Sequence, residues 1–93
     1  MKKKNIVEGR HYGRFEIQRS LIEKDPESVL AIMAHVVVID ITHDFMNDCI
    51  LYNGFSSFFD PLPAMDYVAP EYVWLIEKDS SNRIDHIRVT KIG

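Results

Sequence analysis

Around residue 35 the hydrophobic pattern changes from a helical period to a strand period, and no other feature constrains the fold as strongly. Asp25, Pro26 and Glu27 are typical of a helix start, since Asp accepts hydrogen bonds from free N–H groups, Pro suits the first helical position and Glu favours the positive end of the dipole. Apolar side chains then recur at spacings of three and four residues. A β-branched run, residues 35–42, follows directly and favours a strand. We therefore predict a helix at about residues 26–34 that turns straight into a strand.

A first β-hairpin is predicted around Asn47 and Asp48, because both residue types tolerate the positive φ of tight turns. This turn pairs Phe45 with Ile50 and separates an apolar face of the hairpin from a polar one. The apolar face then holds Ile39, Ile41, Phe45, Ile50 and Tyr52, and the polar face holds Asp40, Thr42, Asp44, Leu51 and Asn53.

A second hairpin is predicted from residues 72–78 and 83–92, which the polar segment Asp79–Asn82 joins. Pairing Lys78 with Arg83 directs one apolar set toward a core, namely Tyr72, Trp74, Ile76, Ile87 and Val89. The opposite face is mixed, and is either a partly covered surface or an interface; it holds Val73, Leu75, Glu77, Ile84, His86 and Arg88.

Residues 12–18 alternate in part like a half-buried strand, although Ser20–Glu23 resembles a capping box, so that a helix from Leu21 competes with that interpretation. Together these elements predict an α+β fold, in which one main helix packs on an antiparallel sheet of four or five strands built from two hairpins. The 93 residues fit a single domain, residues 1–93, with residues 1–10 as a flexible polar lead-in. Because a domain of this size buries only about 60–70% of its unfolded surface, a homodimer is one way to add buried area.

Cys49 is the only cysteine, which excludes an intrachain disulfide and a multi-thiolate metal site. The basic start, Met1–Lys4, is not followed by an apolar run of signal-peptide length. Apolar stretches such as Val36–Ile39 are too short to cross a bilayer. These features predict a soluble, cytoplasmic protein that has no membrane partner.

The charges are distributed unevenly along the chain, whose net charge is only -3. No Lys or Arg occurs between Asp25 and Glu77, so we expect the middle of the protein to project negative potential. Two interpretations stay open: acidic loops that keep a hydrophobic sheet soluble, or an acidic face for a protein partner with a basic surface. Direct binding of nucleic acid is disfavoured, because it requires clustered Lys and Arg.

The segment from Asp40 to Asp44 contains the residue types of a metal or catalytic site but not their spacing. As a calcium loop it has Phe45 where Gly is needed and Leu51 where Glu is needed. Cys49 has no histidine as its expected cross-strand partner, so a nucleophilic role is disfavoured. We therefore predict no catalytic residue, no metal site and no cofactor.

The segment between the two hairpins, residues 56–70, has the turn chemistry of a loop but is rich in aromatic residues. Its aromatic and acidic side chains alternate, which would give apolar anchors inside an acidic rim, as in many interfaces. The alternative is that the loop aromatics fill one end of a small core.

The C-terminal part of the chain resembles a pattern in small uncharacterised phage-encoded α+β proteins. The resemblance lies in Tyr52–Pro63, then Ala69–Tyr72 and a closing hairpin. The resemblance covers about the last 40 residues and names no activity. It implies a mobile-element origin, and small acidic phage proteins of this size often resemble inhibitors of host defence or replication enzymes. This chain is only mildly negative, which departs from a strong mimic of DNA.

These observations predict a non-enzymatic protein-binding module, in the form of a phage-type inhibitor of a host nucleic-acid-binding or defence protein. The acidic and aromatic residues expected to bind the partner are Asp40, Asp44, Asp48, Phe58, Phe59, Asp60 and Asp66. One alternative is a structural homo-oligomer subunit whose contact face holds Val73, Leu75, Ile84 and Arg88. A small metal-dependent hydrolase is the least favoured alternative.

Overall fold

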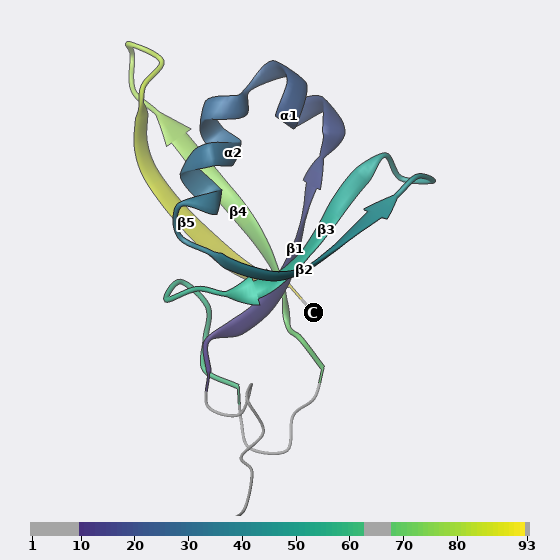
Figure 1. Ribbon diagram of the computed structural model, residues 1–93. Helices are drawn as coiled ribbons and strands as arrows, with labels where there is room; N and C mark the ends of the chain where they lie inside the picture. Colours follow the sequence, from purple (N-terminus) through teal and green to yellow (C-terminus); the bar gives the residue numbers. More distant parts are fainter. Residues whose placement is uncertain (1–9, 63–67, 93) are drawn as a thin grey trace, which may run out of the picture.

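The computed structural model describes residues 10–62 and 68–92 of the chain. Their secondary-structure elements, in chain order, are β1 (Tyr12–Gln18), α1 (Arg19–Lys24), α2 (Pro26–Met33), β2 (Val37–Asp44), β3 (Cys49–Phe55), β4 (Glu71–Lys78) and β5 (Ile84–Ile92). The strands form one sheet in the order β2-β3-β1-β4-β5 (Figure 1). The predicted α+β class and a sheet of this size are therefore confirmed.

The prediction that two hairpins build a purely antiparallel sheet is wrong. β1 lies between the β2–β3 and β4–β5 pairs, antiparallel to β3 along its whole length and parallel to β4 through the single pair Arg14↔Glu71. The central position suits β1 because Phe15 and Ile17 are each only 3% exposed, and such burial requires neighbours on both sides. Gly13 permits the close approach to β4, since a Cβ atom there would lie 2.7 Å from the ring of Tyr72.

The prediction of one main helix is also wrong, because two short helices, α1 and α2, precede β2. α2 begins at Pro26, as predicted; α1 cannot continue through it, since Pro has no N–H group to donate. Asp25 caps α2: its carboxylate accepts hydrogen bonds from the hydroxyl of Ser28 at 2.7 Å and from the Ser28 N–H at 3.4 Å. The amine of Lys78 lies 2.8 Å from the same carboxylate, which ties the helix junction to β4.

The hydrophobic core lies between the sheet and the two helices, which cover the same side of the sheet (Figure 1). Trp74 and Phe15 meet edge to face in this layer, with ring centroids 5.7 Å apart. The buried members of the core are Phe15, Ile17, Ile32, Phe59 and Tyr72.

The strand registers differ from the predicted ones by two residues. The structure pairs Ile50 with His43 rather than with Phe45, because the turn between β2 and β3 takes four residues, 45–48, with a positive φ of 52° at Asp48. It likewise pairs Trp74 with Val89. A shift of two residues keeps each side chain on its own face of a strand, so the apolar set of β4 still faces the helices.

Candidate protein-binding surface

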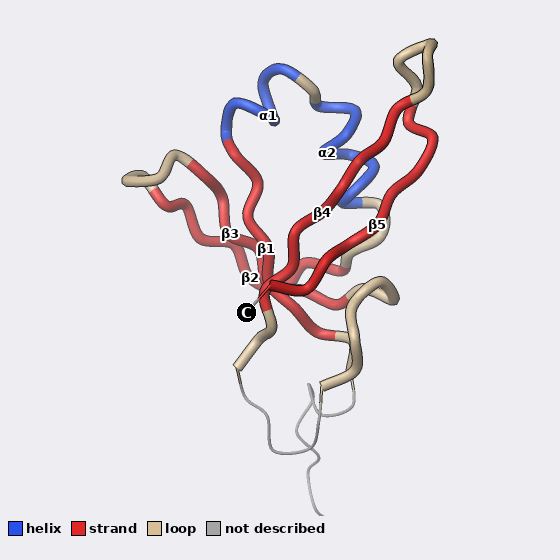
Figure 2. Tube along the Cα trace, turned by 180° about the vertical axis from the view of Figure 1, so that it is seen from behind, coloured by secondary structure: helices blue, strands red, loops and turns tan. Residues whose placement is uncertain are grey.

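The side of the sheet away from α1 and α2, here called the open face, carries two of the predicted partner-binding residues and three of the predicted self-association residues. The register aligns Asp40, Asn53, Arg14, Glu71 and Ile92 in one row across all five strands. Seen from behind, no described helix crosses this side (Figure 2). By register, the open face comprises Tyr12, Arg14, Glu16, Gln18, Val37, Asp40, Thr42, Asp44, Cys49, Leu51, Asn53, Phe55, Glu71, Val73, Leu75, Glu77, His86, Arg88, Thr90 and Ile92.

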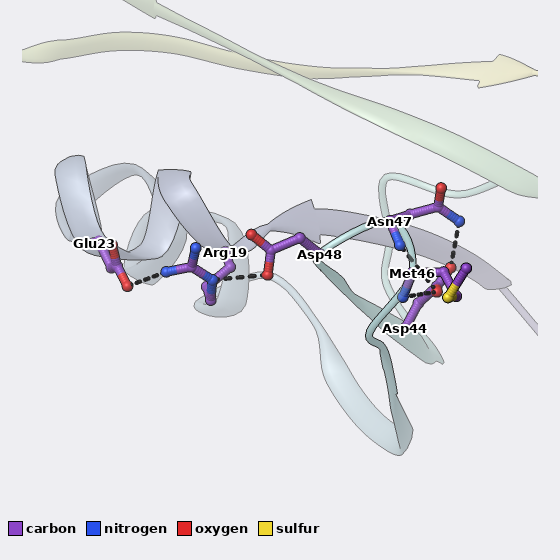
Figure 3. Close-up of polar contacts among 6 residues, drawn as sticks. All are labelled: Arg19, Glu23, Asp44, Met46, Asn47 and Asp48. Atoms are coloured by element: carbon purple, nitrogen blue, oxygen red, sulfur yellow. Dashed lines mark hydrogen bonds and ion pairs between the residues drawn. The ribbon is translucent and has the colours of Figure 1, made fainter.

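Two of the predicted acidic residues, Asp40 and Asp44, lie on the open face. Asp40 is exposed, and its carboxylate makes no hydrogen bond or ion pair with any residue that the structure describes. Asp44 shapes the following turn: its carboxylate accepts hydrogen bonds from the Met46 N–H at 3.1 Å and from the side-chain amide of Asn47 at 2.7 Å (Figure 3). The bonds from Asn47 are the main cause that lowers the pKa of Asp44, so this carboxyl is ionised at neutral pH.

Asp48 does not offer a free charge to a partner. Its carboxylate lies 2.7 Å from Nε of Arg19, and the same guanidinium also pairs with Glu23 (Figure 3). The hydrogen bond from Arg19 lowers the pKa of Asp48 and fastens the hairpin turn to α1. Asp48 therefore holds the fold together at this end, and its charge is compensated inside the molecule.

The two described aromatic residues of the loop, Phe58 and Phe59, pack against the core, as the alternative interpretation of this loop expected. Phe59 is 2% exposed and stacks on Tyr72 with ring centroids 4.4 Å apart, so it cannot serve as a surface anchor. Phe58 is half-buried between His35 and Trp74. The backbone holds this arrangement, because the N–H of Ser56 donates to the carbonyl of His11 at 2.9 Å.

The acids of the same loop do not join the open face. Asp60 is exposed, its N–H donates to the hydroxyl of Tyr72 at 2.9 Å, and its loop lies at the opposite end of the molecule from the β2–β3 turn (Figure 1). Asp66 lies outside the described residues. The predicted partner-binding set is thus divided into two acids on the open face, one compensated acid, two packed rings and one distant acid.

The face predicted for self-association is largely on the open face, with one exception. Val73 is 41% exposed and Leu75 is 39% exposed, and Leu75 pairs with Arg88 across the strands. Ile84 is the exception: an irregularity in β5 pairs it with Lys78, whose amine reaches the helix junction, so Ile84 faces the helices. The open face therefore combines Asp40 and Asp44 of the first predicted surface with Val73, Leu75 and Arg88 of the second.

A hollow of about 700 Å³ opens where β1 and β4 separate. Its lining includes Glu16 and Asp44 from the open face, Ile32 from α2 and Trp74 from β4. The indole N–H of Trp74 is buried and has no hydrogen-bond partner among the residues that the structure describes. A second hollow of about 470 Å³ adjoins it and shares Arg14, Glu71 and Ile92. Sequence reasoning missed the larger hollow, since the only available signal, the alternation of Trp74, assigned that residue to the core.

The chain has a single thiol, that of Cys49. Cys49 is fully buried, and its thiol donates to Oε2 of Glu16 at 3.4 Å. Burial raises the pKa of this thiol, and the neighbouring carboxylate of Glu16 raises it further, so the reactive thiolate is disfavoured. Within residues 10–62 and 68–92, no three His, Cys, Asp or Glu side chains gather closely enough to hold a metal ion.

The same two ranges contain no helix with the length and apolarity that crossing a membrane would require. Comparison of the chain with protein-family models, with curated proteins and with solved structures gives no match.

Proposed function

We propose that this protein is a binding module whose open face receives a basic region of a partner protein. The observation that carries the proposal is the composition of this face: exposed apolar side chains and acidic side chains lie together on a surface that no described helix covers. Protein interfaces commonly combine an apolar centre with a charged rim. Val73 and Leu75 supply the apolar part on β4, and Asp40 and Asp44 supply the acidic part on β2.

The balance of charge on the open face determines the kind of partner. The charges of both arginines on this face are compensated by ion pairs. Nε of Arg14 lies 3.9 Å from Oε1 of Glu71, and Nη2 of Arg88 lies 2.5 Å from Oε1 of Glu77. Among the residues that the structure describes, the acids of this face that form no ion pair are Glu16, Asp40 and Asp44. A surface of this sign attracts basic partners and repels acidic ones, including nucleic acid.

A phage-type inhibitor is the form of this function that we favour. Three carboxylates beside an apolar strip suit the basic surface with which a host defence or replication protein holds nucleic acid. Occupation of that surface would block the host protein without any catalytic step, which agrees with the protonated state favoured for the thiol of Cys49.

The test uses one charge reversal and a matched control. Asp40→Lys reverses a charge on the open face, and Asp60→Lys makes the same change at the far end of the molecule. Tagged wild type and both variants are used to capture proteins from a lysate of the source cells at low and high salt, and the captured proteins are identified by mass spectrometry. Association with the captured partner is then measured by stopped flow.

We expect Asp40→Lys to slow association about ten-fold at low salt, with a smaller effect at high salt. Asp60→Lys should leave the rate nearly unchanged. Equal rates for Asp40→Lys and wild type would refute the acidic open face as the binding surface.

Self-association is the second candidate function, favoured by one specific observation. The edge strand β2 exposes Val37 to 66% and Ile41 to 59%, and an edge of this kind can pair with a second copy of the chain. Light scattering across a hundred-fold range of concentration distinguishes the two candidates. A mass that stays at one chain would exclude the oligomer, and a concentration-dependent doubling would favour it.

A further inference from the structure

The division of the sheet between β1 and β4 leaves two strand edges facing each other. The N–H of Arg14 donates to the carbonyl of Pro70 at 2.9 Å, and Arg14↔Glu71 is the only residue pair that the two strands share. Beyond this pair the strands separate, and α1 and α2 are seen between them from behind (Figure 2).

The alternation of strand backbones decides which groups face this opening. Because the N–H of Arg14 points toward β4, the backbone N–H and C=O of Glu16 and Gln18 point the same way. On the other side, the carbonyl of Pro70 points toward β1, and the same alternation directs the backbone of Trp74 and Ile76 toward it. Two rows of backbone donors and acceptors therefore line the opening.

The opening is a groove with an apolar floor. The hollow of about 700 Å³ between the strands is lined at its base by Ile17, Leu21 and Ile32. The buried indole N–H of Trp74, which lacks a partner among the described residues, belongs to the same lining. A buried donor without an acceptor costs free energy, so an occupant that brings an acceptor to this position gains affinity.

These features select the chemical class of the occupant. Backbone rows on both sides suit an extended polypeptide, which can pair with each of them as an added strand, better than they suit a small molecule. Side chains of such a strand alternate between the apolar floor and the open face. On the open face they would meet Glu16 and Asp44, both of which line the hollow. The other charged residues of the lining are Arg14 and Glu71, which pair with each other, and Lys24 of α1, so its acids outnumber its bases.

We propose that the groove between β1 and β4 accepts an extended segment of the partner protein as an additional strand, in which apolar and basic residues alternate. The apolar side chains fill the floor, the basic ones face Glu16 and Asp44, and a carbonyl oxygen of the segment accepts the indole N–H of Trp74. This inference rests on the proposed function and adds the conformation and sequence pattern of the bound segment.

The test uses a short blocked peptide in which lysine and valine alternate, with a peptide of alternating glutamate and valine as the matched control. Trp74 is the only tryptophan of the chain, so its indole resonance reports on the groove without ambiguity. Titration of the isotope-labelled full chain is followed by NMR, and amide hydrogen exchange is measured with and without each peptide.

We expect the lysine peptide to shift the indole resonance in a saturable manner and to slow amide exchange at Glu16 and Trp74. The glutamate peptide should bind about ten-fold more weakly, because it places like charges together. Two results would overturn the inference: the absence of saturable change at the groove, or perturbation confined to the outer edges β2 and β5.

Two variants separate the contributions. Trp74→Phe removes the donor and should weaken binding of the lysine peptide about five-fold. Glu16→Lys changes an exposed position and should leave the core intact, so it keeps the test possible even if Trp74→Phe fails to fold. This variant should prefer the glutamate peptide to the lysine peptide, which reverses the preference of wild type. An unchanged preference in Glu16→Lys would also overturn the inference, and Asp60→Lys serves as the control with the same change of charge.

The groove and the proposed function can fail separately. If the captured partner protein binds wild type and loses affinity for Asp40→Lys, yet leaves the indole resonance unmoved, the acidic surface stands and the groove is refuted. If Asp40→Lys binds the partner as wild type does while the lysine peptide still occupies the groove, the acidic surface fails and the groove alone stands.

Discussion

Replacement of Phe59 by alanine tests the central claim about the loop, namely that its aromatic residues belong to the core. Phe59 is 2% exposed, and its ring centroid lies 4.4 Å from that of Tyr72 and 5.8 Å from that of Trp74. Removal of a buried phenyl ring loses its transfer free energy and leaves a cavity, which together cost about 3–5 kcal/mol. At about 0.05–0.15 kcal/mol per residue, a domain of this length has roughly 5–14 kcal/mol in total, so the loss is a large share.

The assay is urea unfolding followed by circular dichroism, together with thermal unfolding. A loss of this size should lower Tm by about 12 °C or more, since each kcal/mol shifts a small domain by about 4–8 °C. Phe45→Ala is the matched control, because Phe45 is 80% exposed, and its cost should stay below about 0.5 kcal/mol. If Phe59→Ala costs no more than Phe45→Ala, the ring is not in the core and its role as a surface anchor must be reconsidered.

Two further predictions concern a close backbone contact and the helix junction. Gly54→Ala places a Cβ atom 2.5 Å from the carbonyl oxygen of Val37, so it should destabilise the fold by about 1–3 kcal/mol and loosen the edge strand β2. Urea unfolding measures the loss of stability, and amide exchange in β2 should become faster. Unchanged stability would contradict this contact. The hydrogen bonds from Lys78 and Ser28 lower the pKa of Asp25, so its stabilising effect is complete above its unfolded pKa and is lost as the pH falls through its folded pKa. The Tm difference between wild type and Asp25→Asn should therefore shrink below about pH 4, and a difference that is the same at pH 6 and at pH 2 would argue against it.

Local signals in the sequence were sufficient where the cause of a structure is itself local. Asp25 and Pro26 located the start of α2, because a cap and a missing N–H act within one turn of helix. The faces of β4 were also predictable, since alternation survives the two-residue difference in register. The capping-box pattern of Ser20–Glu23 indicated a helix close to α1, but α1 begins at Arg19 and has no side-chain cap. The packing of Leu21 and Ile22 on the core holds it instead.

The rest depended on contacts between distant parts of the chain. The parallel pairing of Arg14 with Glu71 joins segments that have no pattern in common, so the groove beside it could not be inferred from the sequence. The placement of Ile84 depended on a strand irregularity, which the period of two does not reveal. Of the predicted binding residues, Asp40 and Asp44 remain candidates, because the alternation of side chains along a strand was enough to predict which face they occupy. The charge of Asp48 is compensated by Arg19, and this ion pair could not be predicted because the two residues are distant in sequence.

The single pair between β1 and β4 also bears on how the protein folds. The elements up to Phe55 are contiguous in sequence and include three of the five strands, whereas β4 and β5 come last in the chain. Until the last two strands arrive, Phe15 lacks its contact with Trp74, so collapse of the first part leaves apolar rings in water. Because the two strands share a single residue pair, we expect aromatic packing rather than the hydrogen-bond ladder to couple the unfolding of the two parts.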